Sequence, residues 1–286
     1  MLLGKECGYP RKNVCKTLGK DRGMREIPIL LYKNIGNYPE NMMVEGILPE
    51  TFERQMEFCA ENGFTIVTLG QALDHMNQHI KLSRKSLAIT IDGGYHDAFT
   101  NVLPVLKKYH SQATFFIPPV YIGKERAIKG EPIKCLNWDG VREIESSGME
   151  IGLLAYNGTS IRTKYDEHAI KESVTKAMNI MGREIDNQVK YVAFREGVPE
   201  KSLWGFLQSQ GFHAVFTQCP TNRRAALDGI GRIQIDDDDN NIFLTKISGM
   251  YLFFKDKRSW KYIRRYKIDK VVHRMLETWN SIKGER

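Results

Sequence analysis

Cysteine is scarce in this chain of 286 residues, and no two cysteines form a C-x-x-C pair. The odd number and wide spacing of the cysteines exclude a disulfide scaffold and predict free thiols in a reducing compartment. We therefore expect the chain to be cytoplasmic. The five cysteines are Cys7, Cys15, Cys59, Cys135 and Cys219.

Long hydrophobic runs are also missing. No stretch approaches the roughly 20 continuous apolar residues that a membrane-spanning helix requires. The N-terminus follows Leu2 and Leu3 with glycine and charge, so it lacks the apolar segment of a signal peptide. Hydrophobic residues (42%) and charged residues (27%) occur in the proportions of a globular protein, which excludes disordered and collagenous classes.

The net charge of +8 is concentrated at the two ends of the chain. Residues 1–26 carry seven basic and three acidic groups, residues 255–286 carry eleven and four, and the body at 27–254 has a net charge of −3. The body lacks the clustered basic face and the motifs of a nucleic-acid-binding domain, so we expect no nucleic-acid partner. We expect a basic N-terminal extension (1–26), one globular domain (27–254) and a basic amphipathic C-terminal helix (255–286). This helix either packs on the domain or contacts a membrane surface or a partner in a biosynthetic complex.

Short runs rich in Ile, Val, Phe and Thr alternate with longer amphipathic segments from Ile27 onward. This alternation predicts a parallel sheet with helical crossovers, and the number of units favours a single closed or nearly closed β/α barrel. The predicted strands are IPILLY, TIVTL, SLAITI, ATFFI, MEIGLL, KYVAF, HAVFT, GRIQI and IFLTKI. The acidic run at 236–239 is expected to be a solvated turn before the last of these strands.

Chemistry in such barrels takes place where the strands end and the βα loops begin. The residues at these ends are Lys33, Asp92, the run LLAYNG at 153–158, and Arg195. We therefore expect the functional residues among them.

The segment SLAITIDGGYHDAFTNVLPVLKKYHSQATFFIP resembles the first motif of NodB-type polysaccharide deacetylases, a strand ending in T-F-D-D-G-Y-x-D followed by P-x-L and A-T-F-F. Upstream, IPILLYKNI and PETFERQMEFCAENG look like the start of the subgroup that acts on N-acetylglucosamine polymers. Downstream, LNWDGVREIESSGMEIGLLAYN is similar to W-x-x-x-x-x-L-x-x-x-G-x-E-I-G-x-H-T. The resemblance covers roughly residues 27–250 and implies the same β/α barrel.

The resemblance also implies a metal site, which this sequence does not preserve. In the family, the first Asp of the motif is the general base, and the second Asp and two His bind a divalent metal. Here the first Asp matches Asp92, but the metal-binding positions fall on Gly93, Leu154 and Gly158. We therefore expect no metal cofactor. Zinc or another divalent metal would bind only if residues such as His96 had rebuilt the site; Asp97, the next acid, is expected to cap a helix.

Recognition of a sugar requires fewer residues than hydrolysis of an amide. By the same resemblance, Tyr95, His96, Trp138, Tyr156, Asn157 and Arg195 are the candidate substrate-binding residues, since aromatic faces suit sugar rings and polar side chains suit acylamino or acidic groups. For Trp138 the alternative is packing beneath the helix that follows it.

The leading hypothesis is a degenerate polysaccharide-deacetylase-like protein that binds an N-acylated sugar or glycan in bacterial polysaccharide metabolism. The alternative is an active carbon–nitrogen hydrolase with Asp92 as base and Arg195 as electrophile, working without metal or with substitute ligands. A third possibility is a scaffold that docks through residues 255–286.

Overall fold

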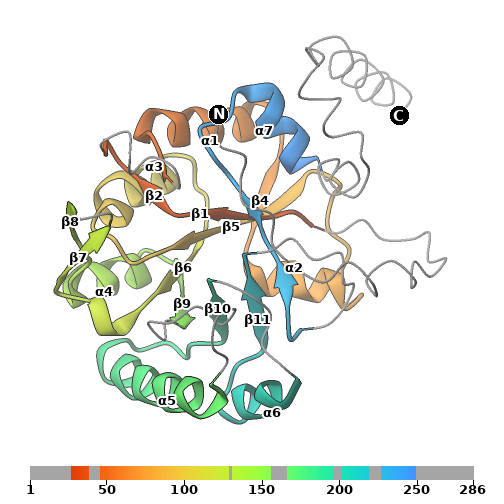
Figure 1. Ribbon diagram of the computed structural model, residues 1–286. Helices are drawn as coiled ribbons and strands as arrows, with labels where there is room; N and C mark the ends of the chain where they lie inside the picture. Colours follow the sequence, from red (N-terminus) through yellow and green to blue (C-terminus); the bar gives the residue numbers. More distant parts are fainter. Residues whose placement is uncertain are drawn as a thin grey trace.

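The structure is a computed structural model that describes residues 27–38, 46–128, 131–155, 166–195, 201–218 and 227–248. In Figure 1, helices surround a barrel of strands. The elements in chain order are β1 (Ile29–Tyr32), β2 (Asn34–Ile35), β3 (Gly46–Ile47), α1 (Pro49–Glu61), β4 (Thr65–Val67), α2 (Leu69–Met76), β5 (Ser86–Asp92), the π-helix η2 (Ala98–Val102), α3 (Leu103–Lys108), β6 (Thr114–Ile117), the 3-10 helix η3 (Pro119–Tyr121), β7 (Glu125–Ile128), β8 (Glu131–Lys134), α4 (Trp138–Ser146), β9 (Glu150–Ala155), α5 (Glu167–Glu184), β10 (Tyr191–Phe194), α6 (Lys201–Ser209), β11 (Ala214–Thr217), β12 (Ile230–Gly231), β13 (Ile233–Gln234) and α7 (Asn240–Ile247).

The main sheet is parallel, as the alternation of strands and helices predicted. Its strands follow the order β12, β11, β10, β9, β6, β5, β1, β13, and β4 pairs with the start of β5. The two ends of this path belong to one stretch of chain, because β12 pairs with β11, β13 pairs with β1, and a single residue, Arg232, separates them. The stretch 230–234 therefore closes the barrel, which confirms the fold predicted from the sequence.

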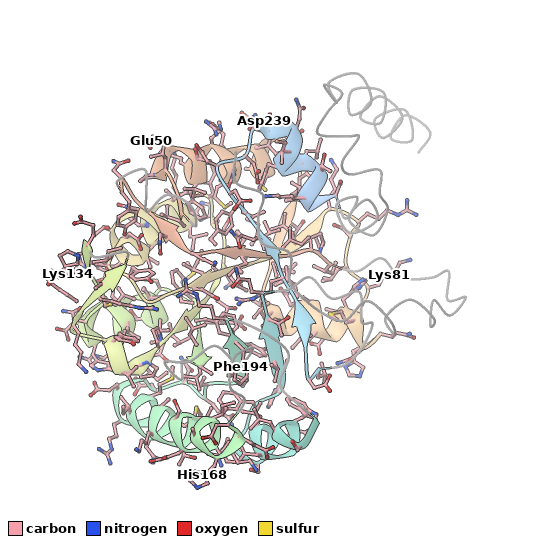
Figure 2. All side chains as sticks on the ribbon, in the orientation of Figure 1. Glu50, Lys81, Lys134, His168, Phe194 and Asp239 are labelled. Carbon is pink, nitrogen blue, oxygen red and sulfur yellow. The ribbon has the colours of Figure 1, made fainter. Side chains whose placement is uncertain are left out.

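Two sets of apolar side chains fill the two sides of this sheet. The inner set comes from alternate strand positions, including Ala88, Phe116, Leu154 and Phe216, and packs against residues of α2. The intervening positions contribute to a larger outer cluster that packs against the surrounding helices. Successive side chains of a strand face opposite sides of the sheet, so the inner set packs inside the barrel. Figure 2 shows side chains crowding the inside of the ring.

The last predicted strand is wrong, because IFLTKI lies in α7. Asp239 begins this helix by accepting hydrogen bonds from the backbone N–H groups of Asn241 and Ile242, both at 2.9 Å. Phe243 and Ile247 are buried one helical turn apart. A six-residue apolar run fits either period, and the capping aspartate decides for the helix.

The acidic run before α7 is only partly solvated, which corrects a second expectation. Asp238 is buried, and its Oδ2 lies 2.5 Å from the Nζ of Lys246, which also contacts Asp236 at 3.1 Å. Burial raises the pKa of Asp238, and the Lys246 ammonium partly offsets this effect. The run therefore forms ion pairs with a side chain of α7 as well as capping this helix.

The expected N-terminal extension and C-terminal helix lie outside the described residues, so the division into three parts stays a prediction. Among the described residues, no helix is long and apolar enough to cross a membrane. Cys59 and Cys135 are buried free thiols, in agreement with the expectation for those two positions. The other three cysteines lie outside the described ranges.

Gly152 in β9 provides a test of the packing inside the barrel. A Cβ at this position would lie 2.5 Å from Cε1 of the fully buried Phe116 ring. We expect Gly152→Ala to lower the free energy of unfolding by about 1–3 kcal/mol, because the ring has little room to move. Urea denaturation monitored by circular dichroism measures the change.

Gly182 in α5 is the matched control, because nothing lies within 4 Å of a Cβ added there. Gly182→Ala is expected to stabilise the helix by about 0.5–1 kcal/mol. Equal effects of the two substitutions would contradict the packing described for Phe116.

Candidate functional site at the mouth of the barrel

The carboxyl ends of the parallel strands form the mouth of the barrel, where the sequence placed the functional residues. Asp92 is the last residue of β5 and is 6% exposed. Lys33 follows β1, and the register that pairs Tyr32 with Ile91 places Lys33 beside Asp92. Lys33 and Asp92 therefore lie next to each other at the mouth, as expected for residues that follow or end neighbouring parallel strands.

Asp92 forms a bidentate ion pair with Arg232. The two terminal guanidinium nitrogens of Arg232 donate to Oδ1 and Oδ2 of Asp92 at 2.6 and 2.7 Å. Arg232 is fully buried. A buried pair of opposite charges is tolerated only when the geometry is good and the remaining donors are satisfied.

The surroundings of Arg232 meet this requirement. Its Nε donates to the carbonyl oxygen of Thr217 at 3.3 Å, and one terminal nitrogen also donates to Oγ1 of Thr90 at 3.2 Å. The guanidinium carbon lies 5.1 Å from the centre of the Phe116 ring, a favourable cation–π position. These contacts fix the orientation of the guanidinium, and with it that of the Asp92 carboxylate.

Sequence reasoning did not identify Arg232 as a functional residue. The run GRIQI was expected to form one strand, but it forms two strands of two residues each, on either side of Arg232. An arginine inside a predicted strand of a buried sheet needs a partner, because burying an unpaired charge is costly. The arginine within the predicted strand was visible in the sequence, but Asp92 could not be identified as its partner without the fold.

The loop after β5 is held by the glycine that follows Asp92. Gly93 has φ +122°, a conformation that other residues rarely adopt. A Cβ there would lie 2.3 Å from Cε2 of Tyr95. The aromatic ring therefore occupies the space that a side chain at position 93 would need.

Tyr95 is buried and makes polar contacts with the β7–β8 hairpin, which was not predicted. Its backbone forms a bridge with Cys135, and its hydroxyl accepts a hydrogen bond from Arg126 at 3.2 Å. The Arg126 guanidinium also lies 4.9 Å from the centre of the Tyr121 ring. Burial raises the pKa of Tyr95, and the charges of Arg126 and Arg195 act against this shift.

Asp97 does not cap the following helix, which corrects the expectation for this residue. It has helical backbone angles, and its side chain makes no capping hydrogen bond. Its Oδ2 instead accepts from the backbone N–H of Ile35 and the hydroxyl of Tyr38, both at 2.8 Å. Burial raises the pKa of Asp97, and these two hydrogen bonds partly offset it. Asp97 therefore ties the β1–α1 connection to the barrel.

His96 and Trp138 lie at the border of this region. The half-buried His96 ring lies 6.2 Å from the ring of Phe99, and its backbone N–H donates to Lys134. Trp138 is the first residue of α4 and packs against the outer core cluster, while the Asn137 side chain caps the helix. Packing beneath the helix was the alternative considered for Trp138.

Gln218 connects two of the basic strand ends. With its amide nitrogen donating to the carbonyl oxygen of Arg195 at 2.7 Å, its amide oxygen accepts from the ammonium of Lys33 at 2.8 Å. Lys33 is 8% exposed and Arg195 is half-buried. The remaining two candidates, Tyr156 and Asn157, lie outside the described residues.

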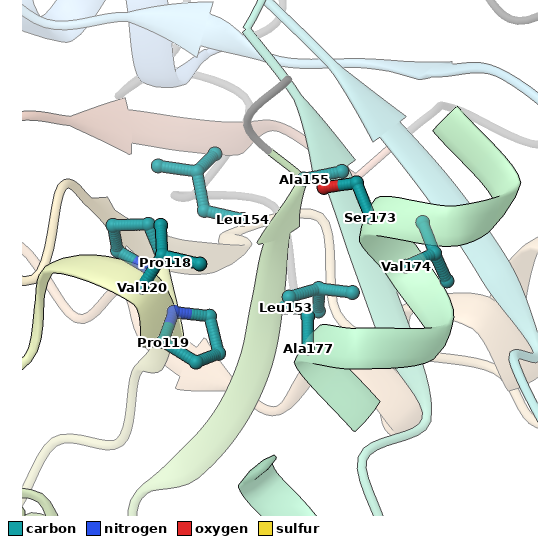
Figure 3. Close-up of a pocket in the computed structure, with 9 residues that line it drawn as sticks. All are labelled: Pro118, Pro119, Val120, Leu153, Leu154, Ala155, Ser173, Val174 and Ala177. Carbon is teal, nitrogen blue, oxygen red and sulfur yellow. The ribbon is translucent and has the colours of Figure 1, made fainter. Parts of the chain in front are cut away.

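A small pocket opens beside the mouth, between η3, the end of β9 and α5 (Figure 3). It holds about 10 Å³, the space of about one water molecule. Its walls are mostly apolar and include Pro118, Pro119, Leu153, Ala155, Val174 and Ala177. This pocket is too small for a sugar ring, so the mouth itself is the candidate site.

Comparison with known proteins identifies the family. The polysaccharide deacetylase family model matches residues 79–215, which include Asp92, Tyr95 and the strand ends up to β10. Residues 79–215 belong to the polysaccharide deacetylase family. The resemblance seen in the first motif is thereby confirmed.

Curated relatives agree with this assignment. YxkH from Bacillus subtilis (strain 168), named as a putative polysaccharide deacetylase, is 31% identical over 144 residues, which cover 50% of this chain and 49% of YxkH. The poly-beta-1,6-N-acetyl-D-glucosamine N-deacetylase of Staphylococcus aureus (strain MSSA476) is 24% identical over 171 residues, which cover 58% of this chain and 56% of that protein. The chain therefore spans about half the length of the curated relatives that it matches.

The solved structure of IcaB from Ammonifex degensii has the same fold, with a TM-score of 0.66 and 21% identity. The match covers 78% of this chain and 95% of the IcaB chain. Because this match covers more of the chain than residues 79–215, the shared fold extends beyond the segment that the family model matches.

The described residues do not fit the metal site that this family implies. They contain no group of three or more His, Cys, Asp or Glu side chains arranged to hold a metal ion. Asp92 is bound to Arg232, Gly93 has the Tyr95 ring against it, and Leu154 belongs to the apolar inner set. The third position, Gly158, lies outside the described residues.

The ion pair between Asp92 and Arg232 should show strong energetic coupling. We expect Asp92→Leu and Arg232→Met each to lower the free energy of unfolding by about 3–5 kcal/mol, because each leaves a buried charge without its partner. The double variant should cost much less than the sum of the two single variants. Urea denaturation of all four proteins measures the coupling. If one single variant does not fold but the double variant does, the two residues are likewise shown to be coupled. If the losses of the two single variants add up to the loss of the double variant, the pairing is contradicted.

The buried Asp97 carboxyl should contribute a pH dependence to stability. Its folded pKa is raised above the ordinary value of 3.8, so the folded state binds more protons and the free energy of unfolding falls as pH rises through this window. We expect Asp97→Asn to remove this component, so that its stability relative to the unsubstituted protein increases from pH 4 to pH 7. Urea denaturation at each pH tests this, with the exposed Asp186→Asn as control. A difference independent of pH would refute the assignment.

Proposed function

We propose that this chain binds an N-acylated sugar or glycan and does not carry out the metal-dependent deacetylation implied by its family. The bidentate pair between Asp92 and Arg232 is the observation that carries this proposal. A general base must present an oxygen to the attacking water, and a metal ligand must present one to the ion. Both oxygens of Asp92 are already bound to the guanidinium.

The ligand class follows from the family and from the residues at the mouth. A curated relative is named as a deacetylase of a polymer of N-acetylglucosamine, and we extend only the sugar to this chain. Arg126 of β7, Tyr121 of η3 and Arg195, which follows β10, supply the planar and hydrogen-bonding groups that suit sugar rings. Trp138 is not included, because it packs against the outer core.

The rival hypothesis is a metal-independent amide hydrolase with Asp92 as base and Arg195 as electrophile. For this reaction the Asp92 carboxylate would have to separate from Arg232. Arg232 is fully buried, and Asp92 is the anion among its described contacts, so the separation would leave a buried positive charge. The cost of separating a buried pair disfavours this reaction. It remains a distinct outcome of the experiment below.

The cellular setting is also part of the proposal. The scarcity of cysteine supports a reducing compartment, and we propose that the chain acts in the cytoplasm in polysaccharide metabolism. A membrane or biosynthetic partner would contact residues 255–286, on the basis of the basic amphipathic sequence there.

Binding and turnover can be measured on the same sample. We expect β-1,6-linked N-acetylglucosamine oligomers to bind in an NMR titration and to release no acetate, with or without added Zn²⁺, Co²⁺ or Mn²⁺. Purified protein should contain less than stoichiometric metal by plasma mass spectrometry. Asp92→Asn should leave the affinity largely unchanged in protein whose circular dichroism confirms folding.

The other outcomes identify the alternatives. Acetate release that requires metal would overturn the proposal and indicate a rebuilt metal site. Metal-independent release that Asp92→Asn abolishes would establish the rival hydrolase. Absence of binding to any acylated sugar would reject a role in glycan recognition.

A further inference from the structure

The turn between α2 and β5 lies at the amino-terminal ends of the strands, opposite the mouth. It connects Met76, the last residue of α2, with Ser86, the first residue of β5, and the labelled Lys81 marks it in Figure 2. Gln78 follows the helix in the left-handed conformation, at φ +63°. Glycine is preferred at such a position, because a Cβ makes this conformation costly. The turn therefore depends on contacts that hold it in place.

Hydrogen bonds of the backbone close the end of the helix. The N–H of His79 donates to the carbonyl oxygen of Asp74 at 2.8 Å, and the N–H of Gln78 donates to that of His75 at 3.1 Å. These two bonds are the Schellman arrangement of a helix end. They hold the first residues of the turn, and the following residues are held by a side chain.

That side chain is His75, which is 5% exposed. Its Nδ1 accepts a hydrogen bond from the backbone N–H of Leu82 at 3.0 Å. A ring nitrogen that accepts carries no proton, so the imidazole is neutral with its proton on Nε2. The Leu82 side chain packs against the inner apolar set, so this bond attaches the turn to the barrel.

A second group lies within reach of the same nitrogen. The carbonyl oxygen of Ile80 is 3.3 Å from Nδ1 of His75. A protonated Nδ1 would donate to this oxygen and could no longer accept from Leu82. The two protonation states of the ring therefore favour two different hydrogen bonds in one turn.

The surroundings of the ring offer no compensation for a positive charge. Among the described residues, no carboxylate forms an ion pair with His75, and Asp74 is paired with His79 at 3.6 Å. The other charged residues of the turn are basic: Lys81, Arg84 and Lys85. A protonated His75 in the closed turn would be a buried charge without a partner, which is costly.

Titratable groups from the strands packed near α2 lie at other places. Glu150 of β9 accepts a hydrogen bond from the first backbone N–H of the helix, at 3.2 Å. The hydroxyl of Tyr191 in β10 lies 3.3 Å from a Cβ placed on Gly70, also at the start of the helix. β4 carries no titratable side chain, and Asp92 ends β5 at the mouth. His75 is thus the titratable group in contact with the backbone of the turn.

We infer that His75 is a pH-sensitive latch. In its neutral form it holds the backbone of Leu82 and keeps the turn at 77–83 closed; in its protonated form it releases Leu82 and donates to Ile80. The open turn binds one proton more than the closed turn, so opening becomes more favourable as pH falls. A histidine side chain changes its charge between about pH 5 and pH 8, so this is the range in which the turn responds.

Amide hydrogen exchange of the whole protein measures the opening. We expect the protection factor of the Leu82 amide to fall about 10–30-fold from pH 7.5 to pH 5.0, because one linked proton allows at most a tenfold change per pH unit. Protection factors already correct for the pH dependence of intrinsic exchange. Amides of α4 should keep their protection. At pH 7.5 the nitrogen chemical shifts of the His75 ring should show the tautomer with the proton on Nε2.

Substitutions at position 75 separate the hydrogen bond from the charge. In His75→Asn the amide oxygen can replace Nδ1 as acceptor and does not titrate, so protection should stay high at both pH values. His75→Phe lacks an acceptor, so protection should be low at both. His79→Asn is the matched control, an exposed histidine of the same turn, and should keep the pH dependence of the unsubstituted protein.

Two results would overturn the latch. One is a Leu82 protection factor in the unsubstituted protein that does not change with pH. The other is an equal fall in His75→Asn, which would assign the titration to another group; this comparison stands even if His75→Phe does not fold. No sugar enters these measurements, so their outcome is independent of the proposed function.

Discussion

The ion pair between Asp92 and Arg232 connects parts of the chain that are 140 residues apart in sequence. Arg232 lies in the stretch that closes the barrel, pairing with β11 on one side and β1 on the other. A buried guanidinium at this junction needs a buried carboxylate opposite it, and Asp92 at the end of β5 supplies one. The closure of the barrel and the charge state of its mouth therefore depend on the same contact.

This contact also determines which chemistry the mouth can support. Both oxygens of this carboxylate accept hydrogen bonds from the guanidinium, so the pair fixes the orientation of the acid at the mouth. The next residue reinforces this, because the positive φ of Gly93 and the ring of Tyr95 leave no room for a side chain. In the loop that resembles the family motif, Asp92 and Tyr95 are thus both engaged in contacts with other parts of the barrel.

The barrel could be predicted from the sequence, because short apolar runs alternate with longer amphipathic segments along the chain. The position of Asp92 could be predicted because it lies in a loop that resembles a known motif. Helix α7 could not, since its short apolar run fits two periods and Asp239 decides between them. The partner of Asp92 could not be predicted either. Arg232 is distant in sequence, and only the closure of the barrel brings its guanidinium within 2.6 Å of the carboxylate. The sequence by itself determined the fold and the strand end that bears the acid. Only the tertiary structure decided that this acid is neutralised, because ion pairing depends on a distance that no local pattern encodes.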